Sequence, residues 1–215
     1  EILRCLVGSE MCIRDRVTDA GVAQAVVINT GIANACTGQA GYENAAETAK
    51  LAGEALNISS DTVLVASTGV IGFTLPMDVI ADGVKKLSGM LKSDVQSAQD
   101  AAEAILTTDT HPKQIAYETT IGGKTVTFGA MCKGSGMIHP NMGTMLGFIM
   151  TDAAISKNLL DKALKGSIED TFNMVSVDGD TSTNDTVLVM ANGMAGNPAV
   201  SYTHLRAHET SQDLV

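Results

Sequence analysis

The sequence predicts an α+β fold, a layered α/β sandwich in which mixed sheets are flanked by helices. Two observations support this class. Short apolar or alternating stretches of strand length recur along the chain, and stretches with apolar residues at helical spacing separate several of them. A Gly-Gly pair also joins two of the strands directly, as in an antiparallel hairpin. Hairpins mixed with helix-connected strands favour layers of sheet and helix.

The predicted strands are apolar runs or alternating stretches of six to eight residues. The run VAQAVVIN begins the series, and DTVLVAS has the same buried character. The two strands beside Gly122-Gly123 alternate, as a half-buried hairpin does. TMLGFIMT and TVLVMA are again apolar, which is typical of strands covered on both faces. In chain order, we expect strands over residues 22–29, 61–67, 115–121, 124–130, 144–151 and 186–191.

The predicted helices are marked by apolar spacing and by residues that begin helices. Alanines of YENAAETAKLAGEAL share one face with Leu56. Pro76 suits the first turn of the second helix, and Ser93 is an N-cap candidate for the third. Ser156 is expected to cap the fourth, with a break near Gly166. In order, we expect helices over residues 42–56, 76–91, 93–106 and 156–175.

The composition limits the function. The chain has 215 residues, a net charge of −10 and a pI of about 4.7, so it has no electrostatic footprint for nucleic acid or an anionic membrane. No apolar run approaches the ~18 residues that span a bilayer. The four cysteines have neither metal-ligand spacing nor a disulfide framework, so we expect a cytoplasmic protein with free thiols.

The two ends differ in character from the rest. Residues 1–16 fit no clear helical or strand period, and residues 201–215 are equally out of character. We expect both to be non-native tails and leave them out of the functional argument. Between them, residues 17–143 and 144–200 are expected to be two parts of one domain, divided at Thr144.

Thr144 lies where a glycine-rich stretch, residues 134–143, meets an apolar run. An N-terminal threonine carries its own base, because its α-amino group has a pKa of about 7.7–8.0 and can accept the hydroxyl proton. An N→O acyl shift that cuts the bond between Gly143 and Thr144 would create that terminus, and a glycine leaves its carbonyl unshielded. On spacing alone, the pattern favours a structural threonine at the start of a strand, because Gly-Thr pairs commonly open strands.

A resemblance adds to this interpretation. Five ordered stretches, covering essentially all of residues 17–198, are similar to motifs of the ornithine acetyltransferase family, the bifunctional glutamate N-acetyltransferases of arginine biosynthesis. Gly143 stands where many members have alanine, and either small residue allows the acyl shift. The five stretches are NTGIANACTGQAGYENA (29–45), VASTGVIG (65–72), ILTTDTHPK (105–113), KGSGMIHPNMGTMLGFIMTDA (133–153) and VDGDTSTNDT (177–186).

The resemblance implies an activity and a set of residues. Members cut themselves before the matching threonine and move acetyl from N-acetylornithine to glutamate through an acetyl-threonine. By this match Thr144 is the nucleophile, Thr68 and Gly69 form the oxyanion hole, and Thr107 and Lys133 bind substrate. No cofactor is implied, and use of acetyl-CoA as a substrate stays open. The cut α and β chains are expected to assemble as a heterotetramer.

Thr108 and Thr110 compete with Thr107 for the matched position, since all three lie in one short stretch. His111 and His139 lie beside prolines in expected loops, and an N-terminal threonine needs no separate base. No metal site is expected, because VDGDTSTNDT lacks the Gly and Glu of an EF-hand loop.

Family members are nearly twice as long as the matching region, so this chain would hold the nucleophile, the oxyanion hole and half a pocket, with little activity of its own. Two other functions remain open. An N-terminal-nucleophile amidohydrolase or aminopeptidase would give the acyl group to water. In a non-catalytic fragment, Thr144 would be structural only.

Overall fold

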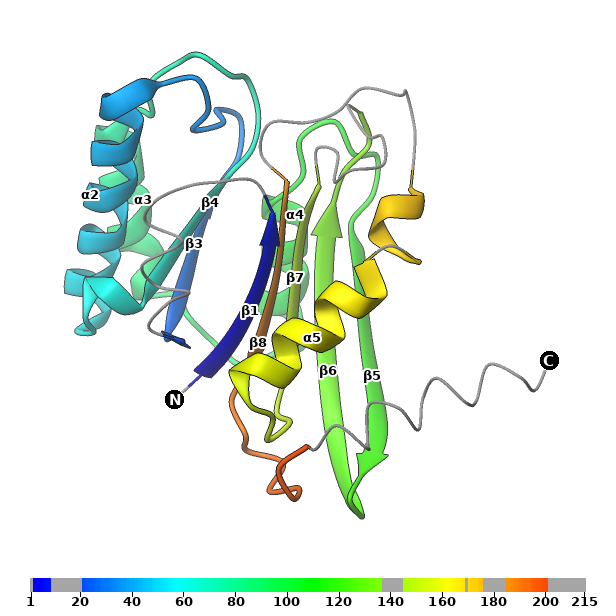
Figure 1. Ribbon diagram of the computed structural model, residues 1–215. Coiled ribbons are helices and arrows are strands. Elements are labelled where there is room, and N and C mark those ends of the chain that lie inside the picture. The colour runs from blue at the N-terminus through cyan, green and yellow to red at the C-terminus, as the bar shows by residue number, and fades with distance from the viewer. Residues whose placement is uncertain (1, 9–20, 137–144, 169, 176–184, 201–215) are drawn as a thin grey trace.

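The computed structural model describes residues 2–8, 21–136, 145–168, 170–175 and 185–200. Its layers are visible in Figure 1: a six-stranded sheet carries α5 on one face, and a two-stranded sheet covered by α2 and α3 lies beside it. Strand order in the larger sheet is β2-β1-β8-β7-β6-β5, with β7 and β8 parallel and the other neighbours antiparallel. The smaller sheet is the parallel pair β3-β4.

The strands are β1 Ile2–Gly8, β2 Val22–Ala23, β3 Ala25–Asn29, β4 Val63–Ser67, β5 Lys113–Ile121, β6 Lys124–Lys133, β7 Leu146–Thr151 and β8 Thr186–Ala191. The helices are α2 Gly38–Leu56, α3 Met77–Ser88, α4 Val95–Ala104 and α5 Lys157–Ile168, with 3-10 turns at Ser60–Thr62 and Phe172–Met174.

Alternation along the strands builds the layers. In β8, Val187 and Val189 pack against α5, whereas Leu188 and Met190 face the other way and join Phe148 of β7. A strand presents successive side chains to opposite faces, so a fully apolar strand can supply two cores at once. The sandwich is therefore held by apolar burial on both faces of its central strands.

The smaller sheet alternates in the same way. Leu64 of β4 faces the core that contains Phe148, while Val63 faces the core under α2. Ala49 and Ala52 form the buried face of α2 there, and their small side chains let the helix lie close to the sheet. The order of layers is thus α5, the large sheet, the β3-β4 pair, and α2 with α3 (Figure 1). The predicted layered α/β sandwich is confirmed.

Most predicted elements are found within a few residues of their expected bounds. The hairpin of β5 and β6 turns at Gly122 and Gly123, whose φ angles of +58° and +78° suit glycine. The predicted cap of the third helix is wrong: Asp94, one residue after Ser93, accepts a hydrogen bond from the Ser97 amide at 2.7 Å. A carboxylate there reaches the third amide of the helix, which is the usual capping geometry.

The lack of a predicted element in residues 1–16 is also wrong in part. The backbone of Ile2–Gly8 forms β1, which pairs with β2 on one edge and β8 on the other. The stretch shows no period in the sequence, and pairing with two distant strands defines it instead. That residues 1–16 and 201–215 are non-native tails stays a prediction.

The expected break near Gly166 lies slightly later: α5 continues through Gly166 and ends at Ile168, and a separate 3-10 turn at Phe172–Met174 follows. Nothing lies within 4 Å of a Cβ built on Gly166. Gly166→Ala should therefore raise the free energy of unfolding by roughly 0.5–1 kcal/mol, since alanine loses less backbone entropy in a helix. Urea unfolding of the variant beside Gly83→Ala, an equally uncrowded position in α3, measures the gain. A lower urea midpoint for Gly166→Ala would contradict the continuous helix.

None of the helices in the described ranges is long and apolar enough to cross a membrane.

Candidate active site

The parallel strands β3 and β4 end side by side, and polar residues follow both ends. Asn29 and Ser67 are register partners, and the Thr68 amide donates to the Asn29 carbonyl at 3.1 Å. This bond continues the pairing of the two chain segments one residue beyond β4. Thr68 itself is only 1% exposed. A buried hydroxyl at the carboxyl end of two parallel strands is well placed for a site.

Gly69 makes the closest backbone approach of this region. A Cβ at this position would lie 2.2 Å from the carbonyl carbon of Gly31, and the φ angle of Gly69 is +133°, which other residues rarely adopt. Hydrogen bonds from the Val70 amide to Gly31 and from the Ala33 amide to Val70 hold the two backbone segments together. Within the described residues the Gly69 amide donates no hydrogen bond. It is therefore available to an acceptor.

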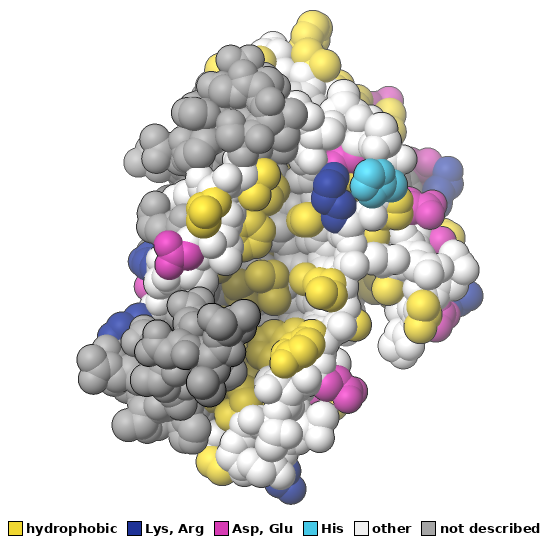
Figure 2. Space-filling model, turned by 90° about the vertical axis from the view of Figure 1, so that its right-hand side faces the viewer, with side chains coloured by type: hydrophobic (Ala, Val, Ile, Leu, Met, Phe, Trp, Pro, Cys, Tyr) yellow, Lys and Arg dark blue, Asp and Glu magenta, His cyan; other side chains and the backbone are white. Residues whose placement is uncertain are grey.

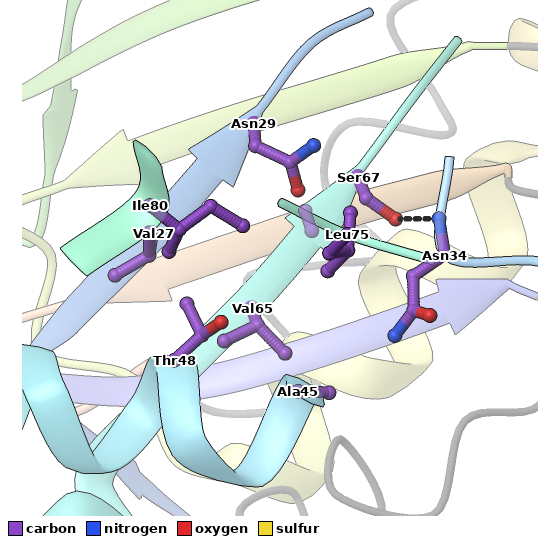
Figure 3. Close-up of a pocket in the computed structure, with 10 residues that line it drawn as sticks. Val27, Asn29, Asn34, Ala45, Thr48, Val65, Ser67, Leu75 and Ile80 are labelled. Carbon is purple, nitrogen blue, oxygen red and sulfur yellow. Dashed lines mark hydrogen bonds between the residues drawn. The ribbon is translucent and has the colours of Figure 1, made fainter. Parts of the chain in front are cut away.

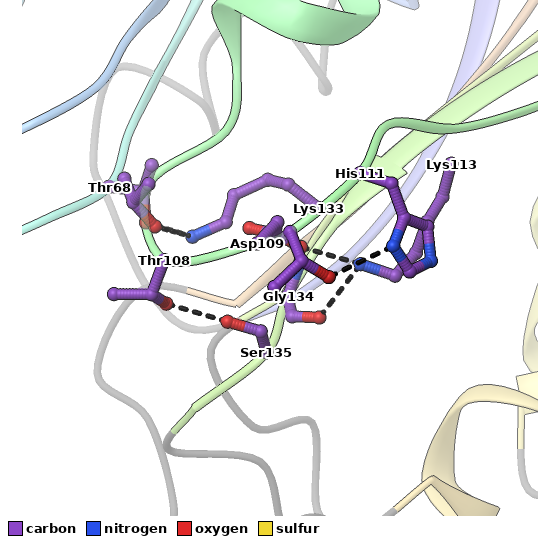
Figure 4. Close-up of polar contacts among 10 residues, drawn as sticks. Thr68, Thr108, Asp109, His111, Lys113, Lys133, Gly134 and Ser135 are labelled. Atoms are coloured by element: carbon purple, nitrogen blue, oxygen red, sulfur yellow. Dashed lines mark hydrogen bonds and ion pairs between the residues drawn. The ribbon is translucent and has the colours of Figure 1, made fainter.

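Lys133, the last residue of β6, brings two distant threonines together. Its Nζ donates to Thr68 Oγ1 at 3.1 Å (Figure 4). It also donates to Thr107 Oγ1 at 2.8 Å, and Lys133 is 3% exposed. No carboxylate lies within ion-pair distance of this ammonium in the described part of the chain. An ammonium has three donors. Two are engaged with hydroxyls, and the third can serve an anionic or carbonyl oxygen.

An ion pair between a buried carboxylate and a half-exposed ammonium lies next to Lys133. Asp109 Oδ1 accepts from Lys113 Nζ at 2.6 Å and from the Gly134 amide at 2.7 Å (Figure 4). Burial would raise the pKa of Asp109, but the hydrogen bonds from Lys113 and Gly134 and the two lysine charges outweigh it and hold that pKa below its usual value. Asp109 is therefore a carboxylate at neutral pH.

Two carboxylates that make no direct contact with Lys133 affect its pKa. Burial lowers the pKa of Lys133, and the charge of Lys113 lowers it further. The carboxylates of Asp109 and Asp185 act in the opposite direction and favour the charged form. The site thus combines a desolvated ammonium with two carboxylates that are not its direct partners.

The start of β7 meets the same place. Leu146 is the register partner of Lys133, and the Met145 amide donates to Asp185 Oδ1 at 2.8 Å. Asp185 is 2% exposed and precedes β8, so this bond ties the beginnings of two parallel strands together. Gly143 and Thr144, the predicted cleavage site and nucleophile, lie outside the described residues, as does His139. The division of the domain at Thr144 stays a prediction.

The structure therefore gathers Thr68, Gly69, Thr107 and Lys133, four of the predicted site residues. It also separates the three competing threonines: Thr107 contacts Lys133, whereas Thr108 bonds Ser135 and Thr110 bonds the exposed His111. The sequence interpretation missed Asp109 and Asp185. Asp109 stands in the motif ILTTDTHPK four residues before Lys113, but this stretch is not helical, so the spacing alone gave no sign of the pair.

A cavity of about 20 Å³ lies between α2, α3 and the β3-β4 sheet, with the Asn29 and Ser67 side chains on its wall (Figure 3). Ser67 Oγ accepts from the Asn34 amide at 2.8 Å. This volume holds about one water molecule. The cavity is consequently too small for an amino-acid substrate and is not part of the site.

Figure 2 shows the side of the molecule on which β5 lies, a hollowed face with apolar side chains over its centre and charged groups nearer its rim. Ile115 and Tyr117 of β5 are 68% and 61% exposed.

Across the described residues, no three His, Cys, Asp or Glu side chains gather closely enough to hold a metal ion.

Lys133→Met is expected to leave the free energy of unfolding at pH 7 within about 1 kcal/mol of its present value. A methionine of similar length removes the cost of the buried charge, which offsets the hydrogen bonds lost at Thr68 and Thr107. The free energy of unfolding should also depend on pH differently in the wild type and in Lys133→Met. Because the folded pKa of Lys133 is lowered, the unfolded chain binds more protons between that pKa and the usual 10.5. The wild type should therefore gain stability over the variant as pH rises through this window.

Urea unfolding of both chains at several pH values measures this difference. Lys86→Met is the control, because Lys86 forms an exposed ion pair with Asp82. A difference between wild type and Lys133→Met that stays constant with pH would contradict the lowered pKa.

The chain is similar to several known proteins. The model of the ArgJ family matches residues 8–214. The "Arginine biosynthesis bifunctional protein ArgJ" of Symbiobacterium thermophilum is 57% identical over 192 residues, which are 88% of this chain and 47% of the relative. The protein of the same name from Lactococcus lactis is 53% identical over 85% of this chain and 45% of its own length. The chain thus spans about half the length of these curated relatives.

Two solved structures are also similar. The crystal structure of the arginine biosynthesis bifunctional protein ArgJ from Bacillus halodurans has a TM-score of 0.56 at 43% identity, over 64% of this chain and 74% of that one. The ornithine acetyltransferase of Mycobacterium tuberculosis, solved in complex with ornithine, has a TM-score of 0.54 at 35% identity, over 60% and 68%. The family match covers nearly the whole chain, and the chain belongs to the ArgJ family.

Proposed function

We propose that the complete protein is a glutamate N-acetyltransferase of arginine biosynthesis, which moves acetyl from N-acetylornithine to glutamate through an acetyl ester on Thr144. One observation carries the proposal: the buried Lys133 ammonium joins Thr68 and Thr107 beside the Gly69 amide. Donors fixed in this way suit the oxygen that becomes negative during acyl transfer. The names of the relatives, arginine biosynthesis and ornithine acetyltransferase, give the substrate class.

The nucleophile is supplied by self-cleavage in this proposal. The Thr144 hydroxyl attacks the Gly143 carbonyl, the peptide nitrogen leaves as the Thr144 amine, and water hydrolyses the resulting ester. Residue 144 is one peptide bond from Met145, which Asp185 holds, and two residues from Leu146, the partner of Lys133. Two residues of chain span at most about 7 Å. This reach supports Thr144 as a member of the site.

Acetyl transfer then proceeds in two steps, first to Thr144 and then to glutamate. The Thr144 amine takes the hydroxyl proton as the oxygen attacks the acetyl carbon of N-acetylornithine, and ornithine leaves with that proton. The glutamate amine next attacks the ester, and Thr144 recovers its proton. In both steps the Gly69 amide and the Thr68 hydroxyl are assigned to the oxyanion, and Lys133 with Thr107 to substrate binding.

The chemistry needs no cofactor, because an amine and a hydroxyl exchange one acyl group. Acetyl-CoA is proposed as a second acetyl donor, consistent with the word bifunctional in the relatives' names. We also propose a cytoplasmic protein whose cut α and β chains assemble as a heterotetramer. The isolated chain, about half the length of its relatives, is expected to transfer little acetyl on its own.

The test measures acetyl transfer by this chain completed with the second half of the Symbiobacterium thermophilum relative. With acetyl-labelled N-acetylornithine, label should appear in N-acetylglutamate, and glutamate should accelerate the loss of the donor. Release of labelled acetate at a rate indifferent to glutamate would identify a hydrolase instead. No consumption of the donor by the completed and folded protein would contradict both functions.

A further inference from the structure

Residues 107–109 bind two consecutive residues, Lys133 at the end of β6 and Gly134 directly after it. Thr107 Oγ1 accepts from the Lys133 side chain at 2.8 Å, and two residues later Asp109 Oδ1 accepts from the Gly134 amide at 2.7 Å. That amide belongs to the peptide that links Lys133 to Gly134. The ammonium and the backbone behind it are therefore held by the same stretch of chain.

Lys113 completes this arrangement. Its Nζ donates to Asp109 Oδ1 at 2.6 Å and to the Gly134 carbonyl at 3.1 Å. Gly134 is thus held at its amide by a carboxylate and at its carbonyl by the ammonium paired with that carboxylate. The Asp109 side chain is 0% exposed, whereas that of Lys113 is 39% exposed. A fully buried carboxylate with a half-exposed partner costs more to desolvate than a surface pair.

We propose that Asp109 is a positioning residue of this site: it fixes the Lys133–Gly134 peptide so that the Lys133 ammonium stays between Thr68 and Thr107, and it places a negative charge near that ammonium. The proposal rests on the acyl-transfer function proposed above. Asp109 contacts no reacting atom in it and acts through Lys133.

The charged groups around Lys133 support the second half of this role. Burial lowers the pKa of Lys133, and Lys113 adds to that effect. Asp109 and Asp185 are the groups that raise it, with Asp109 the larger of the two. Asp185 also holds the Met145 amide, so its replacement would disturb β7 directly. Asp109 is consequently the carboxylate whose charge can be changed while that strand keeps its anchor.

The geometry allows charge and hold to be separated. Asp109 Oδ2 is buried and has no hydrogen-bond partner in the described part of the chain. Asp109→Asn can therefore keep an oxygen towards Gly134 and Lys113 while it loses the charge. Asp109→Ala loses both. Asp94→Asn is the matched control, since Asp94 also accepts a backbone amide, that of Ser97, but lies away from the site.

The experiment follows the Lys133 ammonium and the Gly134 amide by NMR in full chain labelled at lysine and glycine and carrying Thr144→Ala, so that no variant can cut itself. The signal is assigned by its loss in Lys133→Met. In Asp109→Asn, Lys133 should titrate at lower pH than in the parent. In Asp109→Ala it should do so too, and the Gly134 amide should also exchange faster with solvent. Asp94→Asn should change neither.

An unchanged Lys133 titration in both Asp109 variants, with circular dichroism of a folded chain, would overturn the proposal. So would protection of the Gly134 amide that survives in Asp109→Ala. These results do not depend on catalysis. A chain with Thr144 intact that never cleaves would contradict the proposed self-processing, whereas the titration would still decide the role of Asp109.

Discussion

Thr144→Ala is expected to abolish self-cleavage, so that the variant stays whole while the parent chain yields residues 1–143 and 144–215. The hydroxyl is the attacking group, and no other atom of an alanine can form the ester that breaks the Gly143–Thr144 bond. The effect should be complete within the sensitivity of intact-mass spectrometry after incubation, and acetyl transfer by the completed protein should disappear with it.

Two variants make this result specific. Thr144→Ser keeps a hydroxyl on the same carbon and should still cleave. Thr120→Ala removes a threonine hydroxyl from the exposed side of β5 and should cleave like the parent. A parent chain that stays whole beside Thr144→Ala, both alone and in the completed protein, would leave Thr144 a structural residue. Cleavage in Thr144→Ala would place the nucleophile elsewhere.

Local patterns were sufficient for most of the fold. β8 was predicted to its observed bounds, Thr186–Ala191, because a threonine followed by five apolar residues suits a strand with a core on each face. The glycine pair between β5 and β6 defined that hairpin equally well. By contrast, β1 depends on pairing with β2 and with β8, far away in the chain, and no period within seven residues reports such a pairing.

The site shows the same division. The stretches that resemble the acetyltransferase family led to Thr68, Thr107 and Lys133, and the structure brings these three together although they lie up to 65 residues apart. Spacing alone contained no sign of that contact. Asp109 was missed because one of its two partners, the Gly134 amide, is a backbone group 25 residues away. A sequence states which side chains exist, whereas such a bond depends on how β5 and β6 are paired.

Gly69→Ala is expected to be the most damaging substitution of a small residue in the site. The φ angle of +133° alone costs about 1–3 kcal/mol for a residue with a Cβ. The new carbon would also lie 2.2 Å from the Gly31 carbonyl carbon, so one of the two backbone segments must move. That movement breaks the bond between the Val70 amide and the Gly31 carbonyl, about 1 kcal/mol more.

Gly72→Ala separates the two causes. Gly72 has a φ of +81°, but nothing lies within 4 Å of a Cβ placed there. Urea unfolding should therefore show a loss for Gly69→Ala that exceeds the loss for Gly72→Ala by roughly 1 kcal/mol or more, the cost of the broken contact. If the Gly69 amide serves the oxyanion, its displacement should also slow acetyl transfer by about 10²–10³-fold, as loss of one such donor does. Equal transfer rates in the two variants would remove Gly69 from the catalytic site and leave it only the close approach to Gly31.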